Sequence, residues 1–521
     1  MKGFGRQTIC CGGVPEQEQE RWMKNQVQLI AYVDRFSGGG FDNFRRLLDG
    51  PLRGLFGGVH LLPFFWPIDG ADAGFDPIDH ARVDPRLGTW DDVRALAERA
   101  DLIADLIVNH VSCRSPQFED FRKRGDESPY AGMFLTYQRV FPQGATESDL
   151  LRIYRPRPAL PFTRLRLETG AERLLWTTFT PEQIDIDVGD TEGKRYIEQI
   201  LNQFRSAGIR AIRLDAAGYA IKKPGTSCFM IPETFDFIRQ LTDRAHDCGI
   251  EVLVEIHTHY REQIEIARHV DWVYDFALPP LVLHALYTGD SRRLKQWLGV
   301  SPRNAVTVLD THDGIGVIDV GPDRKDPAAR PGLLDADEID GLVETIHQRS
   351  AGASLQATGA AASNLDLYQI NCTYYDALSR RDDEYLIARA LQFFAPGIPQ
   401  VYYSGLLAGT NDLDLLRRTG VGRDINRHYY TRAELEEQVK ATIVRALFDL
   451  IRFRNAHPAF GGNFRVHHSD DSSIAMEWRK DSDWARLDVD LGARCAAISY
   501  SDPAGAQKMT IAPRIVAEVD R

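Results

Sequence analysis

The chain lacks the usual marks of a secreted, membrane-bound or nucleic-acid-binding protein. Its seven cysteines are odd in number and scattered over 521 residues, which argues against a disulfide framework and is typical of a reducing compartment. No apolar run approaches the ~18 residues of a membrane span, and residues 1–22 lack the apolar core of a signal peptide. A net charge of −12 disfavours nucleic-acid or membrane-surface partners. We expect a cytoplasmic protein in which residues 1–22 are either a disordered extension or the result of a start site placed too early, with Met23 then the functional start.

What the chain does have is a regular alternation of short apolar runs and amphipathic helical patterns. Helical patterns at residues 89–100, 196–204, 232–248, 260–270, 385–394 and 431–454 follow several of the runs. The eight candidate strands are residues 27–33, 58–64, 102–109, 211–217, 252–257, 272–276, 305–309 and 399–403. Eight βα units with nearly continuous apolar strands predict an α/β protein, a TIM (β/α)₈ barrel.

The alternation breaks in three places, and each break predicts an added domain. An inserted domain is expected at residues 112–190, after the third strand, and a second insert at 315–380, after the seventh. Within the second insert, residues 351–364 are rich in small side chains and are expected to form a mobile loop. From residue 461 to 521, short alternating segments predict a small antiparallel β-domain. The barrel itself is then built from residues 23–111, 191–314 and 381–460.

The fourth candidate strand carries two charges in an otherwise apolar run. Arg213 and Asp215 are two residues apart, so their side chains share one face of the strand. A buried charge is costly unless it is paired. We expect Arg213 to lower the pKa of Asp215 and keep it ionised. A structural ion pair and a covalent nucleophile both fit this stretch, and it does not distinguish them.

Acidic residues also end two other strands. Asp215, Glu255 and Asp313 each lie at the end of a strand of the predicted barrel, and each has a basic residue alongside: Arg213, His257 and His312. Active sites of TIM barrels lie where strands end, so we expect the three acids to converge. Carboxylates with different protonation states suit cleavage of a glycosidic bond, in which one attacks the anomeric carbon and another protonates the leaving oxygen. The third can stabilise positive charge on the sugar.

These segments resemble the signature regions of the α-amylase superfamily of retaining α-glycosidases. They are Asp-x-x-x-Asn-His ending at His110, Arg-x-Asp-Ala from Arg213, the strand-borne Glu255, His-Asp at 312–313, and residues 183–187 near the end of the first insert. Three departures stand out. Ala211 and Thr311 replace residues that are often Gly and Asn in the superfamily, and residues 218–219 are Gly-Tyr where α-amylases often have Lys-His. The last departure favours a different acceptor subsite.

Five longer stretches, at residues 69–80, 154–158, 223–230, 361–369 and 422–429, resemble the sucrose phosphorylase subfamily. The resemblance implies reversible phosphorolysis of sucrose to α-D-glucose 1-phosphate and D-fructose, with net retention through a β-glucosyl ester on the enzyme. Phosphorylases of sucrose 6′-phosphate or of glucosylglycerol, an α-glucosidase or transglucosylase, and a barrel that binds without catalysis remain as alternatives. Tyr368 favours unmodified sucrose.

The resemblance also implies residue roles. Asp215 is the expected nucleophile, Glu255 the general acid/base and Asp313 the stabiliser, with the carboxyls of Asp215 and Glu255 about 5–5.5 Å apart. The residues implied on the glucose side are Asp72, Phe75, His110, His312 and Arg423. Those implied on the acceptor side are Tyr154, Pro156, Arg157, His257, Asp366, Tyr368 and Gln369. Arg157, between two prolines, suits phosphate. No cofactor and no metal are expected, and a homodimer is possible.

Overall fold

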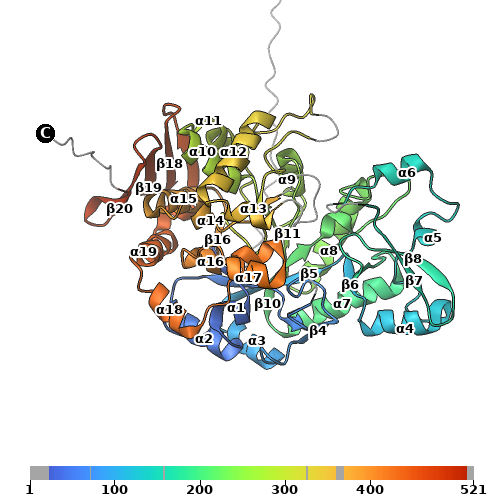
Figure 1. Cartoon of the computed structure of the whole chain (residues 1–521). Coiled ribbons are helices and arrows are strands. Elements are labelled where there is room, and N and C mark those ends of the chain that lie inside the picture. The colour runs from blue at the N-terminus through green and yellow to red at the C-terminus, as the bar shows by residue number, and fades with distance from the viewer. Residues whose placement is uncertain (1–22, 71, 156–158, 324–326, 359–368, 513–521) are drawn as a thin grey trace, which may run out of the picture.

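The structure is a computed structural model (Figure 1) that describes residues 23–70, 72–155, 159–323, 327–358 and 369–512. The predicted disordered extension, residues 1–22, lies outside the described residues. The exact boundaries between barrel, inserts and C-terminal domain stay predictions.

Eight parallel strands close into a barrel, which confirms the predicted fold. Each strand overlaps one of the apolar runs, but the ends differ: the fifth strand stops at Val254, so Glu255 lies just beyond it. Neighbouring registers place Asp105 of the third strand level with Arg213 of the fourth. In order along the chain, the barrel strands are β1 Gln28–Ala31, β2 Gly58–Leu61, β5 Asp101–Ile107, β10 Ile209–Asp215, β11 Glu251–Val254, β12 Trp272–Asp275, β13 Ala305–Thr307 and β16 Ile398–Tyr402.

Helices surround the barrel, as the apolar periodicity predicts. Helix α7, for example, buries a stripe of apolar residues that includes Ile200, Leu201 and Phe204. The helices outside the inserts are α1 Val33–Ser37, α2 Phe41–Asp49, α3 Trp90–Ala97, α7 Thr191–Ser206, α8 Pro232–Asp247, α9 Tyr260–Ile266, α10 Leu278–Thr288, α11 Arg292–Val300, α15 Asp382–Phe394, α16 Tyr403–Leu406, α17 Leu413–Thr419, α18 Arg432–Gln438 and α19 Thr442–Ala456. The pattern at 431–454 is therefore two helices, because the backbone of Ala441 leaves the helical region with a ψ of 140°.

The first insert stands to one side of the barrel (Figure 1). It contains β6 His110–Ser112, α4 Pro116–Arg124, α5 Tyr137–Val140, α6 Glu147–Arg152, β7 Phe162–Arg166, β8 Glu172–Trp176 and β9 Gln183–Asp185. A small apolar cluster around Phe141 and Trp176 is separate from the main core. A buried lysine ties the insert to the barrel, since Lys222 Nζ lies 2.6 Å from both Asn109 Oδ1 and Asp185 Oδ2.

The second insert includes β14 Ile315–Gly316, α12 Ala336–Arg349, α13 Ala353–Ala357, β15 Gln369–Ile370 and α14 Tyr374–Ala377. The expectation of a mobile loop throughout 351–364 is wrong at its start. Residues 353–357 are helical there because Ala353 and Ala357 pack against Leu416 and Ile425. Residues 359–368 lie outside the described part of the chain.

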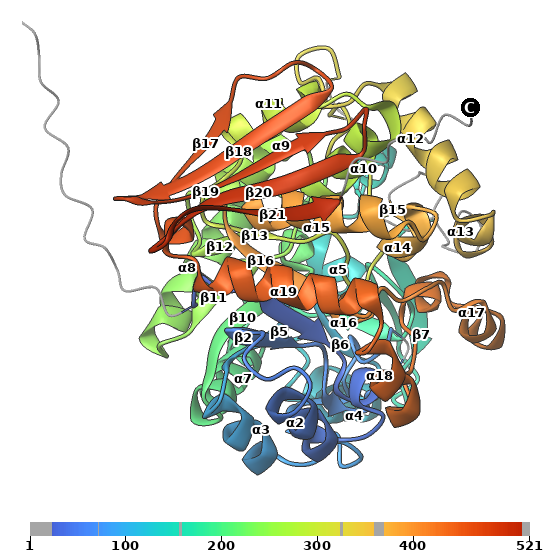
Figure 2. The same cartoon turned by 90° about the vertical axis from the view of Figure 1, so that its left-hand side faces the viewer.

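The C-terminal region is a five-stranded antiparallel sheet, as predicted. Its strands are β17 Asn463–His467, β18 Ser473–Lys480, β19 Asp483–Asp490, β20 Cys495–Asp502 and β21 Gly505–Ala512. The sheet packs against α15 on the outside of the barrel (Figure 2). A two-stranded ribbon, β3 Phe65–Trp66 with β4 Asp79–Val83, lies between β2 and α3 in the chain. In the described residues, no helix combines the length and apolarity needed to cross a bilayer.

Candidate active site

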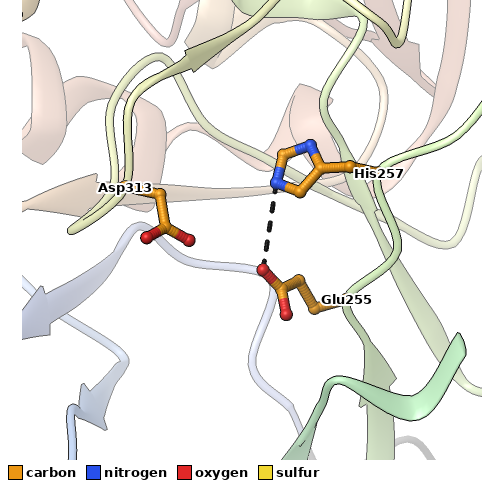
Figure 3. A group of neighbouring side chains, drawn as sticks. All are labelled: Glu255, His257 and Asp313. Carbon is orange, nitrogen blue, oxygen red and sulfur yellow. Dashed lines mark ion pairs between the residues drawn. The ribbon is translucent and has the colours of Figure 1, made fainter. Parts of the chain in front are cut away.

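Three acids meet at the C-terminal mouth of the barrel. Asp215 is the last residue of β10, Glu255 directly follows β11, and Asp313 lies in the loop after β13. Their side chains are 14%, 12% and 9% exposed. Arg213 joins the first two, because its Nη1 lies 3.2 Å from Asp215 Oδ1 and its Nη2 lies 3.0 Å from Glu255 Oε1. Figure 3 shows Glu255 and Asp313 facing the same space as His257. The predicted convergence is therefore present in the structure.

A fourth carboxylate lies beneath this group. Asp105, fully buried on β5, contacts Arg213 Nη1 at 2.5 Å and His60 Nε2 at 3.2 Å. Burial raises the pKa of Asp105, but the charge of Arg213 and the contact with His60 outweigh burial and hold it at about 2. The sequence pattern pairs Arg213 with Asp215 alone. In the structure, the guanidinium of Arg213 also pairs with Asp105, so less of its charge is available to Asp215.

The pKa of Asp215 moves in the opposite direction to the one expected. Burial raises the pKa well above its usual range, and Glu255, Asp105 and Asp313 add to the increase. Arg213 lowers the pKa as predicted, but one guanidinium is shared among three carboxylates. The expectation of a net decrease is wrong for this reason. Acids this close titrate together, and a retaining glycosidase must place the shared proton on its general acid before the nucleophile attacks.

Asp313 has a different environment. Arg423 Nη1 lies 2.9 Å from its Oδ1, and Arg427 Nη2 lies 3.7 Å from the same atom. Burial raises the pKa of Asp313, but the charges of Arg423 and Arg427 lower it far below its usual range. Both arginines also approach Asp72, at 3.8 and 3.9 Å. The inferred proximity of Asp72 and Arg423 is present, and Asp313 keeps a full negative charge.

Aromatic rings form one wall of the same space. The ring of Phe75 stacks on His312, with centroids 4.8 Å apart and an interplanar angle of 11°. The carbonyl of Phe75 lies 3.0 Å from His110 Nε2. Burial lowers the pKa of both histidines, that of His312 well below the ordinary value. Neutral imidazoles can exchange hydrogen bonds with sugar hydroxyls without adding charge.

A second group contains the described residues of the expected acceptor side. His257 stacks on Phe276 at 4.0 Å, and its Nε2 lies 3.8 Å from Glu255 Oε1. The ring of Tyr154 lies parallel to that of Tyr219, with centroids 6.3 Å apart. Gln369 Oε1 accepts a hydrogen bond from the backbone N–H of Gly314, next to Asp313. Four predicted residues lie outside the described residues: Pro156, Arg157, Asp366 and Tyr368.

Comparison with known proteins identifies the family. Residues 55–269 match the model of the α-amylase catalytic domain. A sucrose phosphorylase of Agrobacterium vitis is 63% identical over 92% of this chain and 98% of its own length. A sucrose phosphorylase of Bifidobacterium adolescentis is 52% identical over 93% of this chain and 97% of its own length. The chain belongs to the sucrose phosphorylase family. A crystal structure of a sucrose 6F-phosphate phosphorylase from Thermoanaerobacter thermosaccharolyticum matches with a TM-score of 0.88 at 38% identity, covering 95% of this chain and 99% of that one.

One departure from the α-amylase pattern has a steric cause in this member of the sucrose phosphorylase family. Gly218 stands where α-amylases often have lysine. A Cβ atom at this position would lie 2.7 Å from the ring of Phe229. That ring packs against Tyr219 at 4.6 Å and Tyr154 at 4.8 Å. Glycine therefore allows an aromatic cluster to form beside the nucleophile, on the side where we expect the acceptor.

Three buried residues of the site have no role that the sequence pattern indicates: Asp105, Arg427 and Asp319. Asp105 is part of the Asp-x-x-x-Asn-His signature, so its position is visible in the sequence but its pairing is not. Arg427 follows Arg423 by four residues, and its Nε donates to the carbonyl of His312 at 2.8 Å. Asp319 contacts His257 Nδ1 at 2.9 Å from a distant loop, and no local pattern indicates this contact.

The donor atoms of Glu255, His257 and Asp313 lie within 4.8 Å of one another, close enough to hold a metal ion. The side chains paired with these three residues disfavour a metal site, because each ligand already has a partner. Asp313 is matched by Arg423, Glu255 by Arg213, and one nitrogen of His257 by Asp319. That this family member uses no metal stays a prediction.

Proposed function

We propose that this protein is a sucrose phosphorylase, which converts sucrose and phosphate reversibly to α-D-glucose 1-phosphate and D-fructose. The observation that carries the proposal is the meeting of Asp215, Glu255 and Asp313 at the C-terminal mouth of the barrel, in a chain 63% identical to a sucrose phosphorylase over nearly its whole length. A scaffold without catalysis has no need for three acids in so little space, since close carboxylates repel one another.

In the first half-reaction, a carboxylate oxygen of Asp215 attacks the anomeric carbon of the glucosyl unit. The bond to the fructosyl oxygen breaks, and Glu255 gives that oxygen its proton. Arg213 contacts both acids and stabilises the carboxylate that forms on Glu255. Asp313, held ionised by Arg423 and Arg427, faces the positive charge that develops on the sugar. The products are fructose and a β-glucosyl ester of Asp215.

In the second half-reaction, a phosphate oxygen attacks the anomeric carbon of the ester and releases the carboxylate of Asp215. Glu255 takes the proton of the attacking phosphate if that oxygen carries one. Two inversions at the same carbon give net retention. His257 directs its Nε2 toward Glu255 Oε1, 3.8 Å away (Figure 3), and in this mechanism that nitrogen meets the incoming phosphate.

The glucose unit is held on the side of Asp313. Asp72 and Arg423 suit the hydroxyls farthest from the reacting carbon, because carboxylate and guanidinium groups accept and donate hydrogen bonds in pairs. His110 and His312 suit hydroxyls nearer that carbon, and Phe75 offers an apolar face to the ring. The contact of Arg423 with both Asp72 and Asp313 supports this assignment, since it links the two ends of the glucose site.

The test is a product assay with and without phosphate. With sucrose and phosphate, we expect glucose 1-phosphate and fructose in equal amounts, and little free glucose. Asp215→Asn should abolish both products while the protein stays folded. Free glucose at the same rate in both conditions would instead identify a hydrolase. Glucosides formed from sucrose alone, with phosphate having no effect on the rate, would identify a transglucosylase.

The same assay separates the alternative substrates. The 38% identical structure is of a sucrose 6F-phosphate phosphorylase, so sucrose 6F-phosphate and glucosylglycerol are tested beside sucrose. We expect the largest kcat/KM for sucrose, because the sucrose phosphorylases named above are the more similar relatives at 63% and 52% identity. A larger kcat/KM for either alternative would assign the protein to that substrate.

A cytoplasmic location is also proposed. Cys113, Cys228, Cys248, Cys372 and Cys495 are all free thiols in the described part of the chain, which supports a reducing compartment. The homodimer expected from the family resemblance is tested by sedimentation velocity.

A further inference from the structure

Asp319 is a fully buried carboxylate to which the proposed mechanism assigns no role. It lies three residues beyond β14, in the second insert. Its Oδ1 accepts hydrogen bonds from the backbone N–H of Thr258 at 3.1 Å and from Gln263 Nε2 at 2.8 Å. Its Oδ2 lies 2.9 Å from His257 Nδ1. Asp319 therefore connects the insert to the end of β11, where the general acid/base Glu255 is located.

The contact determines which nitrogen of His257 faces the pocket. Figure 3 shows one ring nitrogen directed at Glu255 and the other directed away from both carboxylates. Asp319 occupies the far side. An ionised carboxylate only accepts hydrogen bonds, so Nδ1 must carry a proton to bond with it. Stacking on Phe276 holds the plane of the ring.

Backbone packing encloses the pair. A Cβ atom at Gly316 would lie 2.5 Å from Asp319 Oδ2 and 3.2 Å from His257 Nδ1. The strand β14 thus approaches as closely as a glycine permits, and a larger residue would force the two side chains apart. A buried bond protected from water in this way is stronger than an exposed one.

Among the described residues, three acids raise the pKa of His257: Asp319, Glu255 and Asp313. Burial lowers the pKa of His257, but these three acids raise it more, so the net shift is upward. An imidazolium donates from both nitrogens, and its Nε2–H then points into the pocket beside Glu255. A fixed cation with a directed N–H attracts an anion such as phosphate more strongly than it attracts a neutral water molecule.

We infer that Asp319 is a positioning residue for the second half-reaction: it holds His257 with its Nε2–H aimed at the acceptor beside Glu255 and so favours phosphate over water. This inference rests on the proposed function, because it takes phosphate to be the acceptor. Asp319 acts only through His257.

The decisive variant is Asp319→Asn. It keeps an oxygen for Thr258 and Gln263, but it places an NH₂ group or a weaker, uncharged acceptor opposite His257 Nδ1. We expect kcat/KM for phosphate to fall about tenfold or more, since a hydrogen bond to a charged group contributes this much. Release of glucose from sucrose in the absence of phosphate should change far less. Equal losses in both rates would overturn the inference.

A second readout does not depend on activity. The ring of His257 is followed by NMR in protein with labelled histidine, and its signal among the 14 histidines is identified by its loss in His257→Gln. We expect its titration midpoint to lie above the ordinary value of about 6.5 in the parent protein. The midpoint should fall in Asp319→Asn, because the carboxylate that raises it is gone. A parent midpoint below the ordinary value, or one that Asp319→Asn leaves unchanged, would refute the inference.

Two further variants separate positioning from packing. Gln263→Met removes a bond to Asp319 Oδ1 and leaves the bond to His257, so it should preserve the preference for phosphate. His257→Gln removes the imidazole and leaves the other bonds of Asp319, so it should lose the preference to the same extent as Asp319→Asn. The double variant Asp319→Asn/His257→Gln should lose no more than either alone. Loss of the preference in Gln263→Met would show a packing effect instead.

Failure of the proposed function gives a different result. If the parent protein makes no glucose 1-phosphate, the proposed function is wrong, and the NMR titration still reports whether Asp319 sets the charge of His257.

Discussion

The two sides of the pocket place the same residue type in opposite electrostatic settings. Asp313 has two arginines within 4 Å, and its pKa is far below the usual range. Asp215 shares one arginine with Glu255 and Asp105, and its pKa is raised. The ratio of cations to acids, rather than the residue type, decides which carboxyl keeps its charge and which can exchange a proton. Stabilising a cation requires the first kind, whereas Asp215 must be free of a proton, which belongs on the general acid, before it attacks the sugar.

The largest expected effect comes from Asp215→Asn. Removing the nucleophile should lower kcat for glucose 1-phosphate formation by at least about 10⁴-fold. Asp313→Asn should also lower kcat strongly, but the reaction should still pass through a glucosyl ester. Rapid quenching followed by mass spectrometry checks the difference: Asp313→Asn should still form a glucosyl ester, and Asp215→Asn should form none. A glucosyl ester on Asp215→Asn would place the nucleophile elsewhere.

Arg423→Met tests the two-arginine side. It removes the closest cation from Asp313 and a partner of Asp72. We expect kcat/KM for sucrose to fall about 10²–10³-fold, the usual effect of losing one preorganised charge partner. Arg427→Met should have a smaller effect, because its contacts with the same acids are longer, at 3.7 and 3.9 Å. A larger loss of kcat/KM in Arg427→Met would contradict this expectation. It would show that the shorter contact of Arg423 with Asp313 contributes less to catalysis than the longer contact of Arg427.

Unfolding in urea sharpens the comparison through stability. At pH 7, Asp313→Asn should destabilise the fold by about 3 kcal/mol, because it removes the closest carboxylate from Arg423 and one of the carboxylates around the fully buried Arg427. Asp215→Asn should raise stability, since the raised pKa of Asp215 means that the folded state bears a cost for its charge. That cost shrinks as the pH falls from the raised folded-state pKa toward the ordinary pKa of the unfolded chain. The advantage of Asp215→Asn should therefore shrink on acidification, and an advantage that is independent of pH would contradict the raised pKa.

The smallest expected effect is that of a chelator. The acids of the possible three-ligand cluster are matched by Arg213 and Arg423, and His257 is matched by Asp319. We expect dialysis against EDTA to leave kcat and the thermal unfolding temperature unchanged. Adding Ca²⁺ or Zn²⁺ afterwards is the control. Loss of activity on dialysis with recovery on addition would show that the cluster holds a metal.

Much of the fold and the reacting centre is predictable from the sequence, because both depend on local patterns. Apolar runs mark the eight strands, and charged residues at their ends mark Asp215, Glu255 and Asp313. Properties that depend on contacts between residues far apart in the sequence are not predictable from local patterns. The raised pKa of Asp215 results from carboxylates on several strands, and the role of Asp319 depends on a contact between residues 62 apart. The break between α18 and α19 is hidden in the sequence because the apolar spacing continues across it.

Lys222 links the first insert to the barrel beside the catalytic mouth. Its amine joins the end of β5 to β9 from inside the protein, where its side chain is 1% exposed. Because this cation is a side chain of the chain itself, it is present in every folded molecule. The link between barrel and insert therefore does not depend on the concentration of any ion in the solution.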